Sequence, residues 1–194
     1  MRRVSRYDDE IWRLVPAEAG PPPEHLARFV HGLGEPPSAL DLGWGDGRLS
    51  AELRAGELVA ADVSREAIGR AGERVPTART VLLEPDEPLP FGDGSFELVL
   101  CAETIEHVRD VQLLLSEVRR VLRPAGRLAV TTPAHGRLTG LDVLVRGFER
   151  RFDPLSPHLR FLTRRSLASV LDAHGFEPGP VRREAGSLLA VARR

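Results

Sequence analysis

The sequence has no lysine, a single cysteine and no long apolar run, and each of these shortages excludes a class of protein. A phosphate loop of the form G-x-x-x-x-G-K-[ST] needs a lysine, whereas all 27 basic residues of this chain are arginine. The single cysteine, Cys101, excludes an internal disulfide and a Cys-rich zinc site. No run approaches the roughly 18 apolar residues that cross a membrane, and the first residues lack the apolar core of a secretory signal. We therefore expect a cytoplasmic protein without a membrane span.

The chain of 194 residues is long enough for one domain with a sizeable core, because 42% of its residues are hydrophobic. Its formal net charge of −1 weighs against a general nucleic-acid binder, which usually has a strongly basic surface. Residues 1–35 are predicted to form an N-terminal arm and a cap helix, with a Pro-rich turn at 20–23 before a helix over 24–33. Residues 36–194 are predicted to form the main domain, with a lid insertion at 134–162.

Apolar patterning in the rest of the chain alternates between short buried strands and amphipathic helices. The clearest helix covers 111–122, where Val111, Leu114, Leu115 and Val118 follow a helical period. Further helices are expected at 48–55, 65–75, 137–152 and 166–174, and strands at 39–42, 58–61, 80–83, 96–101, 128–132, near 176 and at 187–192. Strands separated by helices imply right-handed crossovers. The predicted fold class is therefore α/β, with a doubly wound, mostly parallel sheet of seven strands.

A glycine-rich loop follows the first predicted strand, at the edge where doubly wound sheets bind ligands. The loop reads Gly43-Trp44-Gly45-Asp46-Gly47, and its glycines permit positive φ and leave bare backbone for a ligand. Asp62 ends the second predicted strand about 20 residues after Gly43, where an acid can bind both hydroxyls of a ribose. The loop and Asp62 together predict a cofactor that contains adenosine.

Two features of this loop argue against a dinucleotide. The pattern G-x-G-x-x-G is not completed, because Arg48 or Ser50 stands where the third glycine should be. Asp41 and Asp46 also place negative charge where a pyrophosphate would lie. A loop rich in carboxylates suits a cofactor that carries an amine and a sulfonium.

At this point the sequence resembles a known family. The segment ALDLGWGDGRLS resembles the first motif of class I S-adenosylmethionine-dependent methyltransferases, and VAADVSREAI resembles the second. Three later segments are similar to the small-molecule branch, which includes the ubiquinone-pathway O-methyltransferases: LPFGDGSFELVLCAETIEHV, RRVLRPAGRLAVTTP and PHLRFLTRRSLASVLDAHGF. The resemblance covers about residues 36–192, and it implies a Rossmann-like methyltransferase fold with S-adenosylmethionine as the cofactor.

The resemblance also implies where the cofactor would bind. The residues that would face its methionine part are Asp41, Gly43, Gly45 and Gly47, and Asp62 would bind its ribose. Asp86 would hold the adenine amine, although Pro85 stands at the position where the family often has an acid. Val63 and Cys101 are expected at the same site.

A second group of polar residues follows the fourth predicted strand. Glu103, Glu106 and His107 are spaced i, i+3 and i+4, so they would share one face if the segment is helical. Two carboxylates and an imidazole could hold a divalent cation such as Mg²⁺, Mn²⁺ or Zn²⁺, with His158 as a fourth ligand. The same string occurs in the ubiquinone-pathway enzymes and in small-RNA 3′-terminal 2′-O-methyltransferases. It also occurs in members where the histidine packs without metal, so both interpretations stay open.

His107 and His135 are also candidate general bases, since imidazole titrates near neutral pH. The alternative is that each only makes hydrogen bonds in its loop. Methyl transfer from a sulfonium is an in-line displacement that depends largely on placing the acceptor, so the absence of a clear base does not exclude an enzyme.

The leading functional prediction is a methyltransferase that acts on a small-molecule acceptor. We expect the N-terminal arm, through Tyr7 and Trp12, and residues 137–158 to roof the acceptor pocket, although the same surface fits a homodimer equally well. The first alternative is a metal-dependent small-RNA 3′-terminal 2′-O-methyltransferase, which the overall charge and the lack of an added RNA-binding module disfavour. The second is a protein that binds S-adenosylmethionine without catalysis.

Overall fold

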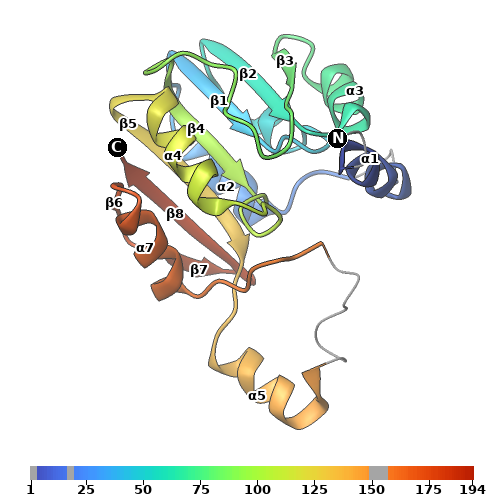
Figure 1. The fold of residues 1–194 in the computed structure, drawn as a ribbon, viewed down its shortest axis with the longest axis vertical. Coiled ribbons are helices and arrows are strands. Elements are labelled where there is room, and N and C mark those ends of the chain that lie inside the picture. Colours follow the sequence, from blue (N-terminus) through green and yellow to red (C-terminus); the bar gives the residue numbers. More distant parts are fainter. Residues whose placement is uncertain (1–3, 17–19, 149–156) are drawn as a thin grey trace.

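A computed structural model describes residues 4–16, 20–148 and 157–194. Eight strands form one sheet in the order β3-β2-β1-β4-β5-β8-β6, with β7 paired to β8 (Figure 1). Their bounds are β1 (Ser38–Leu42), β2 (Glu57–Asp62), β3 (Arg79–Leu82), β4 (Phe96–Ala102), β5 (Leu122–Pro133), β6 (Glu177–Pro178), β7 (Arg182–Glu184) and β8 (Ser187–Arg193). The first five strands are parallel and β8 is antiparallel to β5, which confirms the predicted α/β, mostly parallel fold.

The outer edge of the sheet accounts for the difference between seven predicted strands and eight observed ones. Strand β7 pairs with the start of β8, where Glu184 lies opposite Ser187. Strand β6 pairs with its end, where Glu177 lies opposite Arg193. The two pieces therefore share one position beside β8, so the sheet is seven strands wide.

The helices are α1 (Val4–Leu14), α2 (Glu24–His31), α3 (Arg65–Arg74), α4 (Val111–Val121), α5 (Arg137–Arg146) and α7 (Arg164–Ala173). Four of them confirm the predicted helices at 24–33, 65–75, 111–122 and 166–174. Three begin behind side-chain caps, because the Ser64 hydroxyl accepts the Ala67 N–H, the Asp110 carboxylate accepts the Leu113 N–H, and the Thr163 hydroxyl accepts the Ser166 N–H. Helix α5 ends at Arg146, before Gly147 at φ +88°, and residues 149–152 of the predicted helix lie outside the described residues.

Two local predictions were wrong, and one condition that the sequence left open is not met. The N-terminal arm contains helix α1, which the sequence interpretation did not include. Within the predicted helix at 48–55 the structure has only a single 3₁₀ turn, η1 (Ser50–Glu52). The Asp46 carboxylate accepts the Arg48 N–H and the Asp41 carboxylate accepts the Ser50 hydroxyl, and these side-chain hydrogen bonds compete with those of a helix. The segment from Glu103 to His107 is a turn and not a helix.

Hydrophobic residues cover both faces of the sheet, as its doubly wound topology requires. Successive residues of β4 point to opposite faces, so Leu98 and Leu100 join one core cluster while Val99 joins the other. The first cluster is completed by Leu26, Phe29 and Val30 of α2 and by Leu33 just after this helix. The second is completed by α4 and α7, which lie in front of the sheet in Figure 1, through Leu115, Val118, Val121, Leu167 and Leu171. No described helix is long and apolar enough to cross a membrane.

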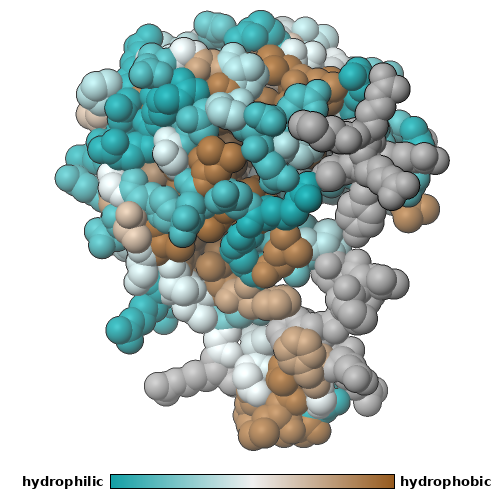
Figure 2. All heavy atoms as spheres, in the orientation of Figure 1, coloured by the Kyte–Doolittle hydropathy of each residue, from teal (hydrophilic) through white to brown (hydrophobic). Residues whose placement is uncertain are grey.

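Helix α5 projects from the body of the molecule (Figure 1). Its exposed apolar side chains, together with Phe148, form the hydrophobic area at the bottom of the space-filling view (Figure 2). These residues are Leu141, Leu144, Val145 and Phe148. The helix belongs to the predicted lid insertion at 134–162, of which residues 149–156 lie outside the described chain.

Candidate functional site

The glycine loop lies where β1 ends, and three of its residues can only be glycine. Gly43, Gly45 and Gly47 have φ values of +79°, +59° and +75°. A Cβ on Gly43 would lie 2.4 Å from the Thr104 side chain, and one on Gly47 would lie 2.6 Å from Nε1 of Trp44. The loop therefore follows a tight path that leaves bare backbone at the carboxyl edge of the sheet.

Asp62 fixes this loop from the end of β2. Its Oδ2 accepts the Gly45 N–H at 2.9 Å, and its Oδ1 accepts the Ser64 N–H at 2.8 Å. The side chain is buried, and this burial raises its pKa. The structure thus brings Asp62 and the glycine loop together, as the sequence predicts for an adenosine site.

Two acids lie at the loop, Asp41 on β1 and Asp46 within the loop itself, and their surroundings differ. Asp41 is 2% exposed, its carboxylate accepts the Ser50 hydroxyl, and burial raises its pKa to about 7. Asp46 forms an ion pair with Arg48, with 2.7 Å between Oδ2 and Nε. Arg48 offsets the charge of Asp46, so the loop is less negative than its sequence indicates.

The three remaining predicted cofactor residues differ in how deeply they are buried. Val63 is half-buried beside Asp62 and packs against the core. Asp86 has φ +61° and forms an ion pair with Arg109 at 3.1 Å, with nearly half of its side chain exposed. Cys101 is 2% exposed within the core of the sheet, and burial raises the pKa of its thiol. The thiol lies close enough to Asp41 and Thr104 to interact with both, and the Thr104 side chain packs on Gly43 of the loop.

The segment after β4 is a turn, so Glu103 and Glu106 do not share the face that a helix would have given them. Glu103 has φ +52°, and its carboxylate accepts the Thr131 hydroxyl at 2.9 Å. Burial raises the pKa of Glu103. Its side chain is held beside β5 and is not part of the group that Glu106 forms with two histidines.

Three of the four predicted metal ligands do come together. Glu106, His107 and His158 each offer a ligand atom, and these atoms lie within 4.8 Å of one another. The Glu106 Oε1 is 3.9 Å from Nε2 of His107, and the two imidazole rings are 4.7 Å apart at their centroids. Glu106 is 1% exposed, and its burial raises the pKa of the carboxyl to about 7. Both of its oxygens lack a hydrogen-bond partner within the described chain.

Comparisons with known proteins agree with this geometry. A family model described as a methyltransferase domain matches residues 40–130, which contain the glycine loop, Asp62 and Glu106. In residues 40–130 the chain therefore carries the sequence pattern of a class I methyltransferase domain that uses S-adenosylmethionine.

Two curated relatives and one solved structure illustrate this class. The malonyl-[acyl-carrier protein] O-methyltransferase of Methylococcus capsulatus is 32% identical over 160 residues, which are 79% of this chain and 57% of that protein. The 23S rRNA (guanine(748)-N(1))-methyltransferase of Streptomyces fradiae is 30% identical over 156 residues, which are 75% of this chain and 53% of that protein. The chain thus spans only about half the length of these relatives. A SAM-dependent methyltransferase from Aquifex aeolicus shares the fold, with a TM-score of 0.64, 21% identity, and coverage of 97% of this chain and 96% of that chain.

Trp12, which was predicted to roof the acceptor pocket, packs on the glycine loop. A Cβ on Gly45 would lie 2.8 Å from Cζ2 and Cη2 of the indole. The sequence did contain a signal for this helix, since Val4, Tyr7, Ile11 and Leu14 follow a helical period. The Tyr7 side chain lies outside what the structure describes.

His135 lies on the other side of the methyltransferase site, directly after β5. Its backbone N–H donates to the Leu162 carbonyl at 2.9 Å, and its ring packs edge-to-face on Phe161 with centroids 5.1 Å apart. The structure therefore places it among the residues of the predicted lid, whereas His107 belongs to the group with Glu106. Their role as general bases stays a prediction.

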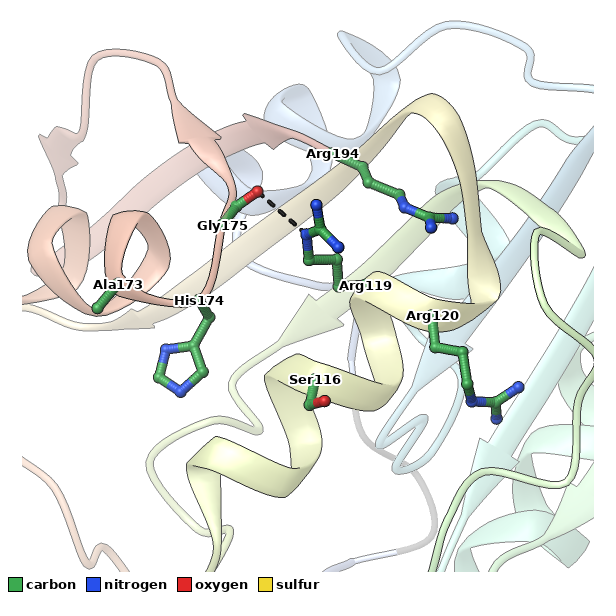
Figure 3. A pocket seen from close by; sticks show the side chains of 7 residues that line it. All are labelled: Ser116, Arg119, Arg120, Ala173, His174, Gly175 and Arg194. Atoms are coloured by element: carbon green, nitrogen blue, oxygen red, sulfur yellow. Dashed lines mark hydrogen bonds between the residues drawn. The ribbon is translucent and has the colours of Figure 1, made fainter.

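The protein also has a cavity of about 570 Å³ between the carboxyl ends of α4 and α7 (Figure 3). It lies near Gly126 at the start of the β5 ladder, away from the glycine loop, and no predicted site residue lines it. The Arg119 Nε–H donates to the Gly175 carbonyl across it at 3.2 Å. Its lining residues are Ser116, Arg119, Arg120, Ala173, His174, Gly175 and Arg194.

Proposed function

We propose that the protein transfers the methyl group of S-adenosylmethionine to a small-molecule acceptor. The observation that carries this proposal is the glycine loop held by Asp62, at the carboxyl edge of a parallel sheet. When bound, the cofactor supplies an electrophilic methyl group on a sulfonium. The residues of the chain bind this group, orient it and position the acceptor.

Each part of the loop has a separate task in this proposal. The bare backbone at Gly43 and Gly45 would lie against the methionine part of the cofactor. Each Asp62 oxygen already accepts one N–H, which leaves a lone pair on each oxygen for the two ribose hydroxyls. Asp41 supplies a buried carboxylate behind the loop, which favours a cationic ligand over a phosphate.

We infer that the acceptor binds on the side of the loop formed by the ends of β4 and β5. Glu103, Glu106 and His135 lie there, next to the predicted lid insertion. A small molecule suits the formal net charge of −1 better than an RNA does. The relatives named above act on malonyl-[acyl-carrier protein] and on 23S rRNA, so the test includes an RNA substrate.

The group of Glu106, His107 and His158 supports a second element of the proposal, a divalent cation beside the acceptor. The Nδ1 of His107 lies 3.1 Å from the Pro157 carbonyl. If this nitrogen carries the proton, Nε2 keeps its lone pair for a metal on the side that faces Glu106. The unpartnered buried carboxylate of Glu106 fits a cation, and bound metal would supply charge to hold an acceptor oxygen.

The enzymatic proposal is tested by methyl transfer from labelled cofactor to a metabolite extract, with an RNA pool in parallel. We expect label in the metabolite fraction, and we expect Asp62→Asn to lower cofactor affinity at least tenfold while the exposed Asp172→Asn does not. Label only in the RNA would replace the small-molecule acceptor by a nucleic acid. Cofactor binding without transfer to either pool would support a non-catalytic binding protein.

The metal element has its own test. We expect chelator-treated protein to bind Mn²⁺ in a calorimetric titration, and His158→Ala to abolish the heat of binding. His174→Ala, which removes a histidine from the distant cavity, is the matched control and should not change it. An unchanged titration with His158→Ala, or no binding by the wild type, would mean that the two imidazoles only pack against each other.

A further inference from the structure

Helix α1 lies across the place where the proposed function puts the cofactor. The indole of Trp12 touches the backbone of Gly45 so closely that a methyl group could not be added there, because the Cβ would lie 2.8 Å from two ring carbons. The bare backbone that the loop offers to a ligand is therefore already covered at Gly45. A ligand that rests on this residue has to displace the indole, since two groups cannot occupy the same face.

The position of α1 is defined by specific contacts with α3. The Asp9 Oδ1 accepts the Ser64 hydroxyl at 2.7 Å and the Glu66 N–H at 3.3 Å, so it lies at the amino end of α3, where a negative charge is favourable. Beyond the end of α1, Arg70 donates from Nη1 to the Val15 carbonyl at 2.7 Å. These contacts hold the helix at two points, on either side of Trp12. Figure 1 shows α1 beside α3.

The same docking brings like charges together. Burial raises the pKa of Asp62, and the nearby charge of Asp8 raises it further. The charge of Arg109, which forms an ion pair with Asp86, lowers the pKa of Asp8 and so offsets part of this repulsion. The hydrogen bonds of Asp9 therefore favour the docked position of α1, whereas the charge of Asp8 near Asp62 disfavours it.

We propose that α1 is a gate over the cofactor site: in the docked position Trp12 covers Gly45, and the cofactor enters only when α1 lifts from α3. This inference rests on the proposed function, because it assumes that the cofactor binds on the glycine loop. With the gate, the apparent affinity equals the intrinsic affinity multiplied by the fraction of molecules in which α1 is open. Weakening the docked position therefore makes binding tighter, which is opposite to the usual effect of removing a residue at a binding site.

The test measures the affinity and association rate of S-adenosylhomocysteine for the full chain by calorimetry and stopped-flow. Two variants open the gate in different ways: Trp12→Ala removes the indole, and Asp9→Ala removes the contacts with Ser64 and Glu66. We expect both to bind faster and about fivefold to tenfold more tightly, as expected when a minor open state becomes dominant. Leu14→Ala, at an 85% exposed position on the same helix, is the control and should match the wild type.

The other possible results would each overturn the gate, and one of them would overturn the proposed function as well. Weaker binding by Trp12→Ala would overturn the gate and show that the indole contacts the bound cofactor. Equal binding by the wild type and both variants would also overturn it, as would tighter binding by Trp12→Ala without any change in Asp9→Ala. If none of the proteins binds S-adenosylhomocysteine, the proposed function fails as well. The two failures are therefore distinguishable.

Discussion

The buried carboxylate of Asp41 should make the protein less stable at neutral pH than it would be with a neutral side chain. Asp41 is 2% exposed, and its only hydrogen bond among the described side chains comes from the Ser50 hydroxyl. Burial raises its pKa from 3.8 to about 7, so the folded state binds this proton more tightly than the unfolded state does. Stability is therefore highest below pH 4 for this group, and it is lost as the pH rises toward 7.

The magnitude follows from the size of the pKa change. About three pKa units at 1.36 kcal/mol each correspond to a loss of ~4 kcal/mol in the free energy of unfolding, complete near pH 7. Asp41→Asn keeps the shape and can still accept the Ser50 hydroxyl, but it has no charge to bury. We expect the variant to be ~4 kcal/mol more stable than the wild type at pH 7–8, and the difference to shrink below ~1 kcal/mol at pH 4.

Urea unfolding from pH 4 to pH 8, with linear extrapolation to water, measures this difference. Asp172→Asn, at an exposed position on α7, serves as the control and should give a difference that does not change with pH. Equal stability of Asp41→Asn and the wild type across the range would refute the reasoning, and so would a variant that is less stable at pH 8. The same variant should lose affinity for S-adenosylmethionine, because the carboxylate behind the loop favours a cationic ligand.

Three further predictions concern the glycine loop and the packing of the fold. Gly43→Ala should lose cofactor binding and lower the melting temperature, because its Cβ would lie 2.4 Å from the Thr104 side chain at a φ of +79°. Gly140→Ala, which adds a Cβ in open space, should change neither property. Arg120→Ala should lower the free energy of unfolding by ~2 kcal/mol, since the guanidinium donates to the Leu89 and Phe91 carbonyls and to Glu117. Denaturant titration measures the change in the free energy of unfolding. Leu167→Ala should cost ~3 kcal/mol in the same assay, because this side chain is fully buried, and a cost below 1 kcal/mol would contradict the packing described for α7.

The sheet and most helices were predictable from sequence because their signals are local and repeated. The parallel strands are short apolar runs buried on both faces, and α4 carries its apolar stripe through Leu115, Val118 and Val121. The glycine loop and Asp62 were predictable for a similar reason, since strand ends at one edge of a sheet meet in space. These features need no information about distant parts of the chain.

The failures occur where side chains bond to backbone or to remote residues. The segment after Gly47 has good helix formers, yet side-chain contacts of Asp46 and Asp41 stop it after one turn at Ser50–Glu52. The turn after β4 depends on Glu103 at φ +52°, which Thr131 holds from the next strand. The contact between Trp12 and Gly45 joins residues 33 positions apart, and no local pattern encodes it.

The division of the outermost strand into β6 and β7 has a consequence for self-association. An unbroken strand there would present a long row of free peptide groups, on which the edge of another molecule could add by hydrogen bonding. Pro178, Gly179 and Pro180 interrupt that row, and the two proline nitrogens cannot donate. This break protects the border of the sheet against templated aggregation, although the strand beside it is among the most apolar in the protein.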